Sequence, residues 1–154
     1  MYWMNAGMGE TIFSPTYLAL RNRGVKFNFF HKVTNLGVSA DGKQIETISM
    51  DVQATPKPDL PNGYEPLFPV KGIPCWPTQP FFDQLVEGDA IRQCVNGNLE
   101  SWWSDWKPVA SKTLQRGEDF DVVVLATSLG TLPYLSLIHI YAERQRHRLR
   151  ERTL

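Results

Sequence analysis

Aromatic side chains that could stack on a flat ligand are concentrated near residue 100. Trp102, Trp103 and Trp106 occupy three of five consecutive positions and offer large planar rings to a sugar or another flat substrate. Helical spacing would instead place Trp102 and Trp106 on one stripe with Leu99, and such a stripe is typical of a core. Both interpretations stay open, and Trp76, Trp102 and Trp106 are the candidate substrate-binding residues.

Side chains suited to acid–base, nucleophilic or metal chemistry are sparse. His31, His139 and His147 have no spacing typical of metal ligands, and neither Cys75 nor Cys94 has an evident base partner. We therefore predict no metal site and assign no catalytic residue. His31 is interpreted as a structural residue of a strand.

An αβ unit is predicted near the start of the chain. The glycine turn Gly7–Gly9 leads into a helix with Ser14 as N-cap and Pro15 at its first position. Gly24 is suited to the left-handed position after the helix. Residues 25–33 then alternate between apolar and polar side chains, which predicts a strand.

Two further sheet segments are expected. Asp41-Gly42 predicts a tight hairpin turn between a short strand at residues 37–39 and a longer one within 44–52. Residues 120–126 form an apolar, β-branched run that is typical of a strand buried on both faces. We expect this run to be among the most buried parts of the chain.

Proline dominates the segment between residues 55 and 80, which holds eight of the 11 prolines. Because proline fixes φ and lacks an N–H donor, we expect neither a helix nor a central strand there. The segment is also too apolar for a free linker. It is either the wall of a substrate channel, with Trp76 facing substrate, or an ordinary insertion loop.

The order of these pieces resembles the FAD-dependent amine oxidase and phytoene desaturase superfamily. The matching residues are the Gly7–Gly9 turn, the helix, Gly24 followed by the strand to Val33, and the strand that ends in Ala126-Thr127. The turn is not the GxGxxG dinucleotide fingerprint, because the third glycine and the later acidic residue are missing. The resemblance implies that FAD contacts Gly7, Gly9, Val33, Ala126 and Thr127.

The same resemblance implies a fold and a domain division. The expected fold class is mixed α/β (α+β): a partial FAD/NAD(P)-binding Rossmann-like domain with a β-hairpin and an inserted substrate-domain segment. Residues 1–54 would belong to the FAD-binding domain, 55–115 to the insertion, and 116–134 to the strand that returns. Residues 135–154 resemble a translated sequencing adapter followed by an artefactual tail, although its five arginines would otherwise suggest a basic arm.

The expected function is that of an internal fragment of an FAD-dependent oxidoreductase. Such an enzyme transfers hydride from a C–N or C–C bond of a small or hydrophobic organic substrate to the flavin, so the cofactor carries the chemistry. The fragment alone is expected to be inactive, and it is open whether it folds independently. The alternative is a non-catalytic ligand- or carbohydrate-binding module that uses the Trp102–Trp106 cluster.

Charge and hydropathy limit the classes of partner and the cellular location that we expect for this chain. The 16 basic and 16 acidic residues give a formal net charge of zero, which does not favour nucleic-acid binding. No apolar run reaches the roughly 18 residues of a transmembrane helix. With two cysteines and no signal-peptide pattern, we expect a cytoplasmic protein.

Overall fold

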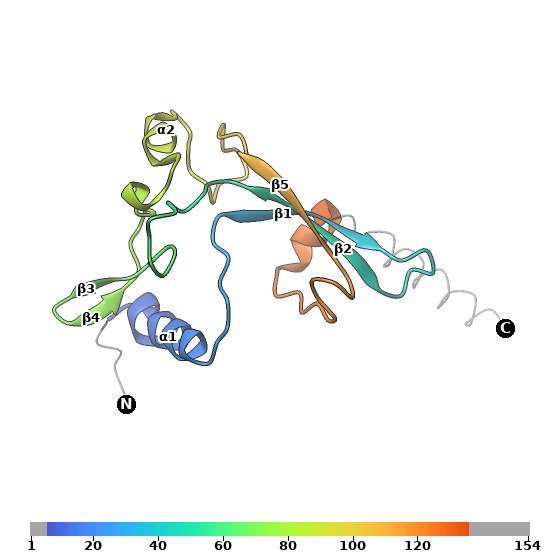
Figure 1. Cartoon of the computed structure of the whole chain (residues 1–154), viewed down its shortest axis with the longest axis horizontal. Coiled ribbons are helices and arrows are strands. Elements are labelled where there is room, and N and C mark those ends of the chain that lie inside the picture. Colours follow the sequence, from blue (N-terminus) through green and yellow to red (C-terminus); the bar gives the residue numbers. More distant parts are fainter. Residues whose placement is uncertain (1–5, 136–154) are drawn as a thin grey trace. The chain divides into compact units, whose positions relative to one another are not determined.

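The computed structural model describes residues 6–135, and they form a mixed α+β protein (Figure 1). The helical elements are η1 (Gly9–Phe13), α1 (Ser14–Asn22), η2 (Phe82–Gln84), α2 (Gly88–Gln93) and η3 (Leu129–Leu135). The strands are β1 (His31–Val38), β2 (Ile45–Val52), β3 (Phe68–Val70), β4 (Ile73–Cys75) and β5 (Ala110–Gln115).

The chain divides into two units, which we describe one at a time. The helical unit takes its described residues from Met1–Phe30 and Ala54–Lys107, and it contains α1, α2 and the β3–β4 hairpin. The sheet unit takes its described residues from His31–Gln53 and Pro108–Leu154, and it contains β1, β2, β5 and η3. The predicted Rossmann-like arrangement and domain division remain predictions.

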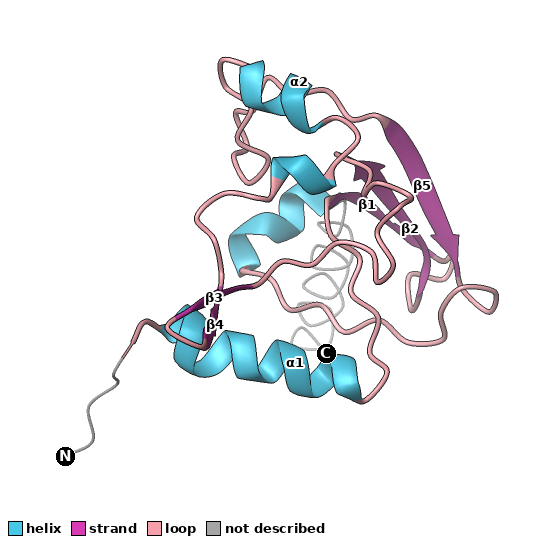
Figure 2. Cartoon of the chain, turned by 60° about the vertical axis from the view of Figure 1, so that its left-hand side comes forward, coloured by secondary structure: helices cyan, strands magenta, loops and turns pink. Residues whose placement is uncertain are grey.

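The sheet unit is a three-stranded antiparallel sheet in the order β1-β2-β5 (Figure 2). One register line joins Leu36, Ile48 and Leu114, and Leu36 is only 3% exposed. The neighbouring line joins Asn35, Ser49 and Thr113, so apolar and polar residues alternate across the sheet as a half-covered sheet requires. The predicted hairpin is confirmed.

The turn of that hairpin is built as the sequence indicates. The Ser39 N–H donates to the Gln44 carbonyl at 2.8 Å, and the Gly42 N–H donates to the Ser39 carbonyl at 2.8 Å. Gly42 has a φ of 69°, a left-handed value that a glycine adopts without a steric penalty. Asp41 accepts from the Ser39 hydroxyl at 2.5 Å, which closes the turn on its outer side.

The predicted strand at residues 25–33 is wrong over most of its length. Residues 25–29 form no strand, and β1 begins only at His31, after Phe30 turns the chain with a φ of 60°. Phe27 and Phe29 instead direct their rings to Tyr17, so side-chain packing replaces strand pairing there. From His31 the strand runs to Val38 and absorbs most of the predicted short strand at 37–39.

The predicted buried strand at residues 120–126 is also wrong. After β5 the chain makes one isolated bridge between Arg116 and Phe120 and then continues without strand structure to η3. Val122 and Val124 are 79% and 88% exposed. The local pattern favours a strand, but no other described strand pairs with this run, and a strand without a neighbour has no ladder to stabilise it.

The N-terminal helix begins earlier than predicted, so Ser14 is not its N-cap. A π-helical turn, η1, precedes α1, and the Ser14 N–H and hydroxyl both donate to the Gly9 carbonyl. The wider turn suits Pro15, whose ring would crowd the carbonyl of Thr11 in a regular α-helix. At the other end Gly24 has a φ of 84° and its N–H donates to the backbone carbonyl of Arg21, as predicted for a helix stop.

The proline-rich segment behaves as expected. Residues 55–80 contain no helix, and their only strands are the short edge strands β3 and β4, in which Pro69 and Pro74 face each other. The turn between them uses Lys71 and Gly72, whose φ angles of 50° and 82° fit a tight hairpin. Pro66 is fully buried, so the segment packs as part of the helical unit.

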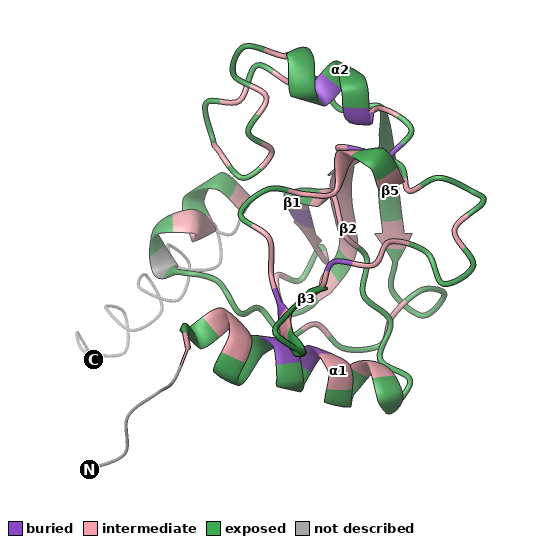
Figure 3. Ribbon diagram, turned by 90° about the vertical axis from the view of Figure 1, so that its left-hand side faces the viewer, coloured by how far each residue is buried: buried purple, intermediate pink, exposed green. Residues whose placement is uncertain are grey.

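The core of the helical unit comes mainly from its segment Ala54–Lys107. Ala54, Leu85 and Ile91 are at most 2% exposed, and a second set of rings and side chains packs on them: Phe30, Tyr64, Phe82, Leu99 and Trp106. Figure 3 shows the buried positions as short purple segments, which include turns of α1 and α2. The core is therefore small and depends heavily on partly exposed aromatic side chains.

Candidate functional site

The glycine turn lies at the start of the N-terminal helix. The Gly7 carbonyl accepts from the N–H and the hydroxyl of Thr11, at 3.0 and 2.9 Å. Gly7 is exposed, and Gly9 lies against Trp76, since a Cβ on Gly9 would be 3.7 Å from Trp76 Cδ1. The structure thus brings one predicted cofactor residue, Gly9, next to one predicted substrate residue, Trp76.

Trp76 belongs to a set of aromatic rings that pack on one another. Its ring meets Tyr17 edge-on with the centroids 5.4 Å apart. Tyr17 also contacts Phe27 at 4.7 Å, and the set continues through Phe29 to Tyr64 at 5.3 Å. The Trp76 indole N–H is buried and has no hydrogen-bond partner among the described residues. We call these five residues the aromatic cluster.

An ion pair between Arg21 and Glu65 lies beside Tyr17 of the aromatic cluster. Arg21 of α1 makes two 2.6 Å hydrogen bonds to the two carboxylate oxygens of Glu65. The hydrogen bond to Glu65 is the main reason that the pKa of Arg21 is raised. Burial raises the pKa of the Tyr17 phenol, Arg21 opposes that rise, and Glu65 adds to it. The pair is about 35–40% exposed at its side chains, so its net stabilisation is at most about 1 kcal/mol.

The side-chain amide of Gln84 also holds the backbone at Glu65. The Gln84 side-chain oxygen accepts from the Glu65 backbone N–H at 2.8 Å, and its side-chain nitrogen donates to the Glu65 backbone carbonyl at 3.0 Å. The side chain thus pairs with the backbone as a neighbouring strand would. The Tyr64 hydroxyl accepts from the Phe81 N–H at 3.0 Å. Burial raises the pKa of Tyr64, and the hydrogen bond from Phe81 partly offsets the rise. These contacts hold the proline-rich segment against η2, and together they indicate a structural role.

The remaining predicted cofactor residues lie in the sheet unit. Val33 lies in β1 opposite Met50, next to an irregularity in the ladder, and it is 39% exposed. Ala126 and Thr127 are exposed on the segment without strand structure, where the Thr127 hydroxyl is 2.7 Å from that of Thr131. The roles predicted for these residues are neither supported nor contradicted by their positions.

The tryptophans near residue 100 do not form a helical stripe. Trp106 packs on the core of Ala54, Leu85 and Ile91, whereas Trp102 is 61% exposed and Trp103 is 79% exposed. The helical interpretation fails because residues 99–106 form turns instead of a helix. Sequence reasoning missed Trp103 as a candidate residue, although the serines at 101 and 104 signal a turn at that point.

No known family model matches the chain, and no curated protein or solved structure matches it significantly. Within residues 6–135, no group of three or more His, Cys, Asp or Glu side chains is placed to hold a metal ion. In the same range, no helix has the length and apolar character that crossing a bilayer requires. Any functional argument must therefore start from the residues themselves.

Proposed function

We propose that this chain is an interior part of a larger FAD-dependent oxidoreductase of the amine oxidase and phytoene desaturase type. The sequence resemblance supplies the flavoprotein class, and the observation that carries the larger protein is the exposed apolar run at residues 122–125, where Val122 and Val124 are 79% and 88% exposed. Soluble proteins rarely leave such a run open, and its composition is that of a strand with neighbours on both sides. In the proposed protein, strands from outside this chain supply those neighbours.

The described residues alone do not fit FAD. Gly7 and Gly9 lie at the start of the N-terminal helix, and Ala126 and Thr127 are exposed on a segment without strand structure. No glycine-rich fingerprint for a pyrophosphate is present in the sequence. We therefore assign the cofactor, and hydride transfer from a small or hydrophobic organic substrate, to the larger protein, and we derive no catalytic step from these residues.

The test is to recover the coding sequence that extends beyond this chain and to purify its product. The proposal expects a βαβ unit with GxGxxG before Met1, together with visible flavin absorption in the purified protein. Denaturation should release FAD, which chromatography identifies. A gene without that motif, or a colourless product that binds no FAD, would refute the proposal. In a flavin-fluorescence titration, the 154-residue chain alone is expected to bind FAD weakly or not at all.

A pair of substitutions tests the exposed run itself. In the larger protein Val124→Asp should abolish flavin retention, because it would place a charge in the run that the proposal expects neighbouring strands to cover. Val86→Asp, at a valine of the helical unit that is 58% exposed, is the matched control and should retain the flavin. Equal flavin content in both variants would show that the run is not a strand of the cofactor layer.

A further inference from the structure

The loop at residues 95–105 contains a β-turn whose two central residues are tryptophans. The Ser104 N–H donates to the Ser101 carbonyl at 3.3 Å, so Trp102 and Trp103 are the two central residues of a β-turn. The Trp103 N–H also donates to the Ser101 hydroxyl at 3.2 Å. Turn corners favour Gly, Pro, Asn, Asp and Ser, so the turn itself does not require these two rings.

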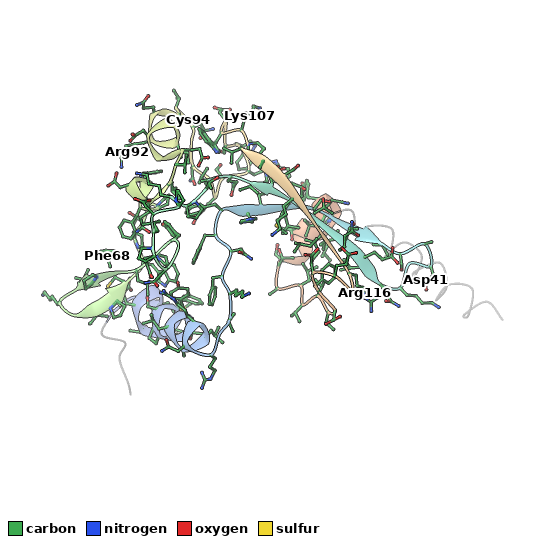
Figure 4. The ribbon with its side chains drawn as sticks, in the orientation of Figure 1. Asp41, Phe68, Arg92, Cys94, Lys107 and Arg116 are labelled. Atoms are coloured by element: carbon green, nitrogen blue, oxygen red, sulfur yellow. The ribbon has the colours of Figure 1, made fainter. Side chains whose placement is uncertain are left out.

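Asn96 holds this turn in one shape. Its side-chain amide donates to the Trp103 carbonyl at 2.5 Å, and its own carbonyl accepts from the Ser104 hydroxyl at 3.1 Å and the Asp105 N–H at 3.0 Å. The loop is therefore fixed by its own hydrogen bonds, and a ligand would not have to order it. Cys94 and Lys107 flank the loop, and both are labelled in Figure 4.

The loop carries negative charge and no positive charge. Residues 95–105 contain two acidic residues, Glu100 and Asp105, and no Lys, Arg or His, so their formal charge is −2. Both acidic residues are exposed, and among the described residues neither carboxylate forms an ion pair or a hydrogen bond. Of the nearest cations along the chain, Arg92 is engaged with Asp83 and Asp89, and Lys107 is exposed just after the loop.

We propose that this loop binds an organic cation that carries a substituted ammonium group. The face of a tryptophan ring attracts such a cation more strongly than any other side-chain ring does, and Trp102 and Trp103 are both largely exposed. The carboxylates of Glu100 and Asp105 add long-range attraction. A neutral sugar would make no use of this charge, and an anionic lipid surface would be repelled by it.

Choline and its neutral isostere 3,3-dimethylbutan-1-ol provide the test. We expect choline to change the tryptophan fluorescence of the full chain saturably and the isostere to do so at least about fivefold more weakly. Trp103→Ala should weaken choline binding about fivefold or more, with far-UV circular dichroism confirming that the fold is retained. As a measurement that needs no substitution, choline should shift the indole N–H resonances of Trp102 and Trp103 but not that of Trp76.

A charge-matched pair of variants isolates the role of the carboxylates. Glu100→Gln with Asp105→Asn should weaken choline binding, whereas Asp59→Asn with Glu118→Gln changes the net charge equally at exposed positions outside the loop and should not. Equal binding of choline and its isostere, equal affinity in the two double variants, or tighter binding of glucose than of choline would overturn the proposal. So would the absence of any choline-dependent shift at Trp102 and Trp103.

Discussion

Each of the two units of this chain is stabilised internally by a different kind of interaction. The helical unit depends on side chains distant in sequence, such as the Arg21–Glu65 pair and the aromatic cluster around Tyr17. The sheet unit depends on the backbone ladders of β2 with β1 and β5, and among its described residues Leu36 is the only buried apolar side chain. Removing one member of a side-chain network leaves its partners without their contacts, whereas a ladder spreads its stabilisation over many bonds.

The largest expected effect comes from a core leucine in each unit. Leu85→Ala should lower the free energy of unfolding of the helical unit by about 2–5 kcal/mol, because it opens a cavity among Ala54, Ile91 and the rings on them. Leu36→Ala should cost the sheet unit an amount at the lower end of that range. Val86→Ala, next to Leu85 but 58% exposed, is the control and should change stability by less than about 0.5 kcal/mol.

Urea unfolding separates the two effects. All the described tryptophans lie in the helical unit, so their fluorescence reports that unit, while far-UV circular dichroism reports both. Leu85→Ala should shift the fluorescence transition more than Leu36→Ala does. Equal shifts from the two variants would contradict the idea that the units are stabilised separately.

Substituting one glycine in each unit gives a second comparison between the helical unit and the sheet unit. A Cβ on Gly88 would overlap the backbone carbonyl of Phe82, whereas a Cβ on Gly37 would overlap only the hydroxyl of Thr47. A backbone carbonyl cannot move without its chain, but a hydroxyl can rotate away. We expect Gly88→Ala to destabilise the protein by about 1–3 kcal/mol and Gly37→Ala by less than about 1 kcal/mol. Thermal unfolding checks the order, and the reverse order would contradict it.

The sequence indicated local structure better than long-range packing. The hairpin turn at Asp41-Gly42 and the helix stop at Gly24 were predictable, because each depends on the φ angles of a few adjacent residues. The strand at residues 120–126 was not, because a strand exists only where another strand pairs with it. Aromatic alternation at residues 25–29 likewise predicted a strand, yet the rings there pack on Tyr17.

The candidate site shows the same division. Trp102 could be selected from its residue type, but only the turn geometry shows that Trp103 is exposed beside it and that Trp106 is part of the core. The Arg21–Glu65 pair spans 44 residues, and no local pattern announces it. Sequence reasoning therefore found the aromatic residues without finding which of them face solvent.

A smaller effect is expected at the tyrosines of the helical unit. Tyr64→Phe removes the acceptor of the Phe81 N–H and should cost about 1 kcal/mol at neutral pH. The pKa values of Tyr17 and Tyr64 are raised from 10.0, so the folded state favours the protonated phenols. Their contribution is fully present below pH 10.0 and is lost as pH rises through the folded-state pKa.

Urea unfolding at a series of alkaline pH values measures this loss. In Tyr17→Phe and Tyr64→Phe the free energy of unfolding should fall less steeply above pH 10.0 than in the unmodified chain. If both helical-unit variants kept the full alkaline slope, the burial of these phenols would not be responsible for it.

The smallest effect is expected at the hairpin of the sheet unit. Hydrogen bonds from the Ser39 hydroxyl and, second, from the Lys43 N–H lower the pKa of Asp41. Because the folded-state pKa is lowered, its contribution is present above the ordinary pKa and is lost as pH falls through the lowered value. In an NMR titration, Ser39→Ala should move the Asp41 carboxyl pKa back up toward its ordinary value. Ser49→Ala, on the polar face of β2, should not move it, and the unfolding transition should hardly change in either variant because a turn in a ladder of this length is not its main support.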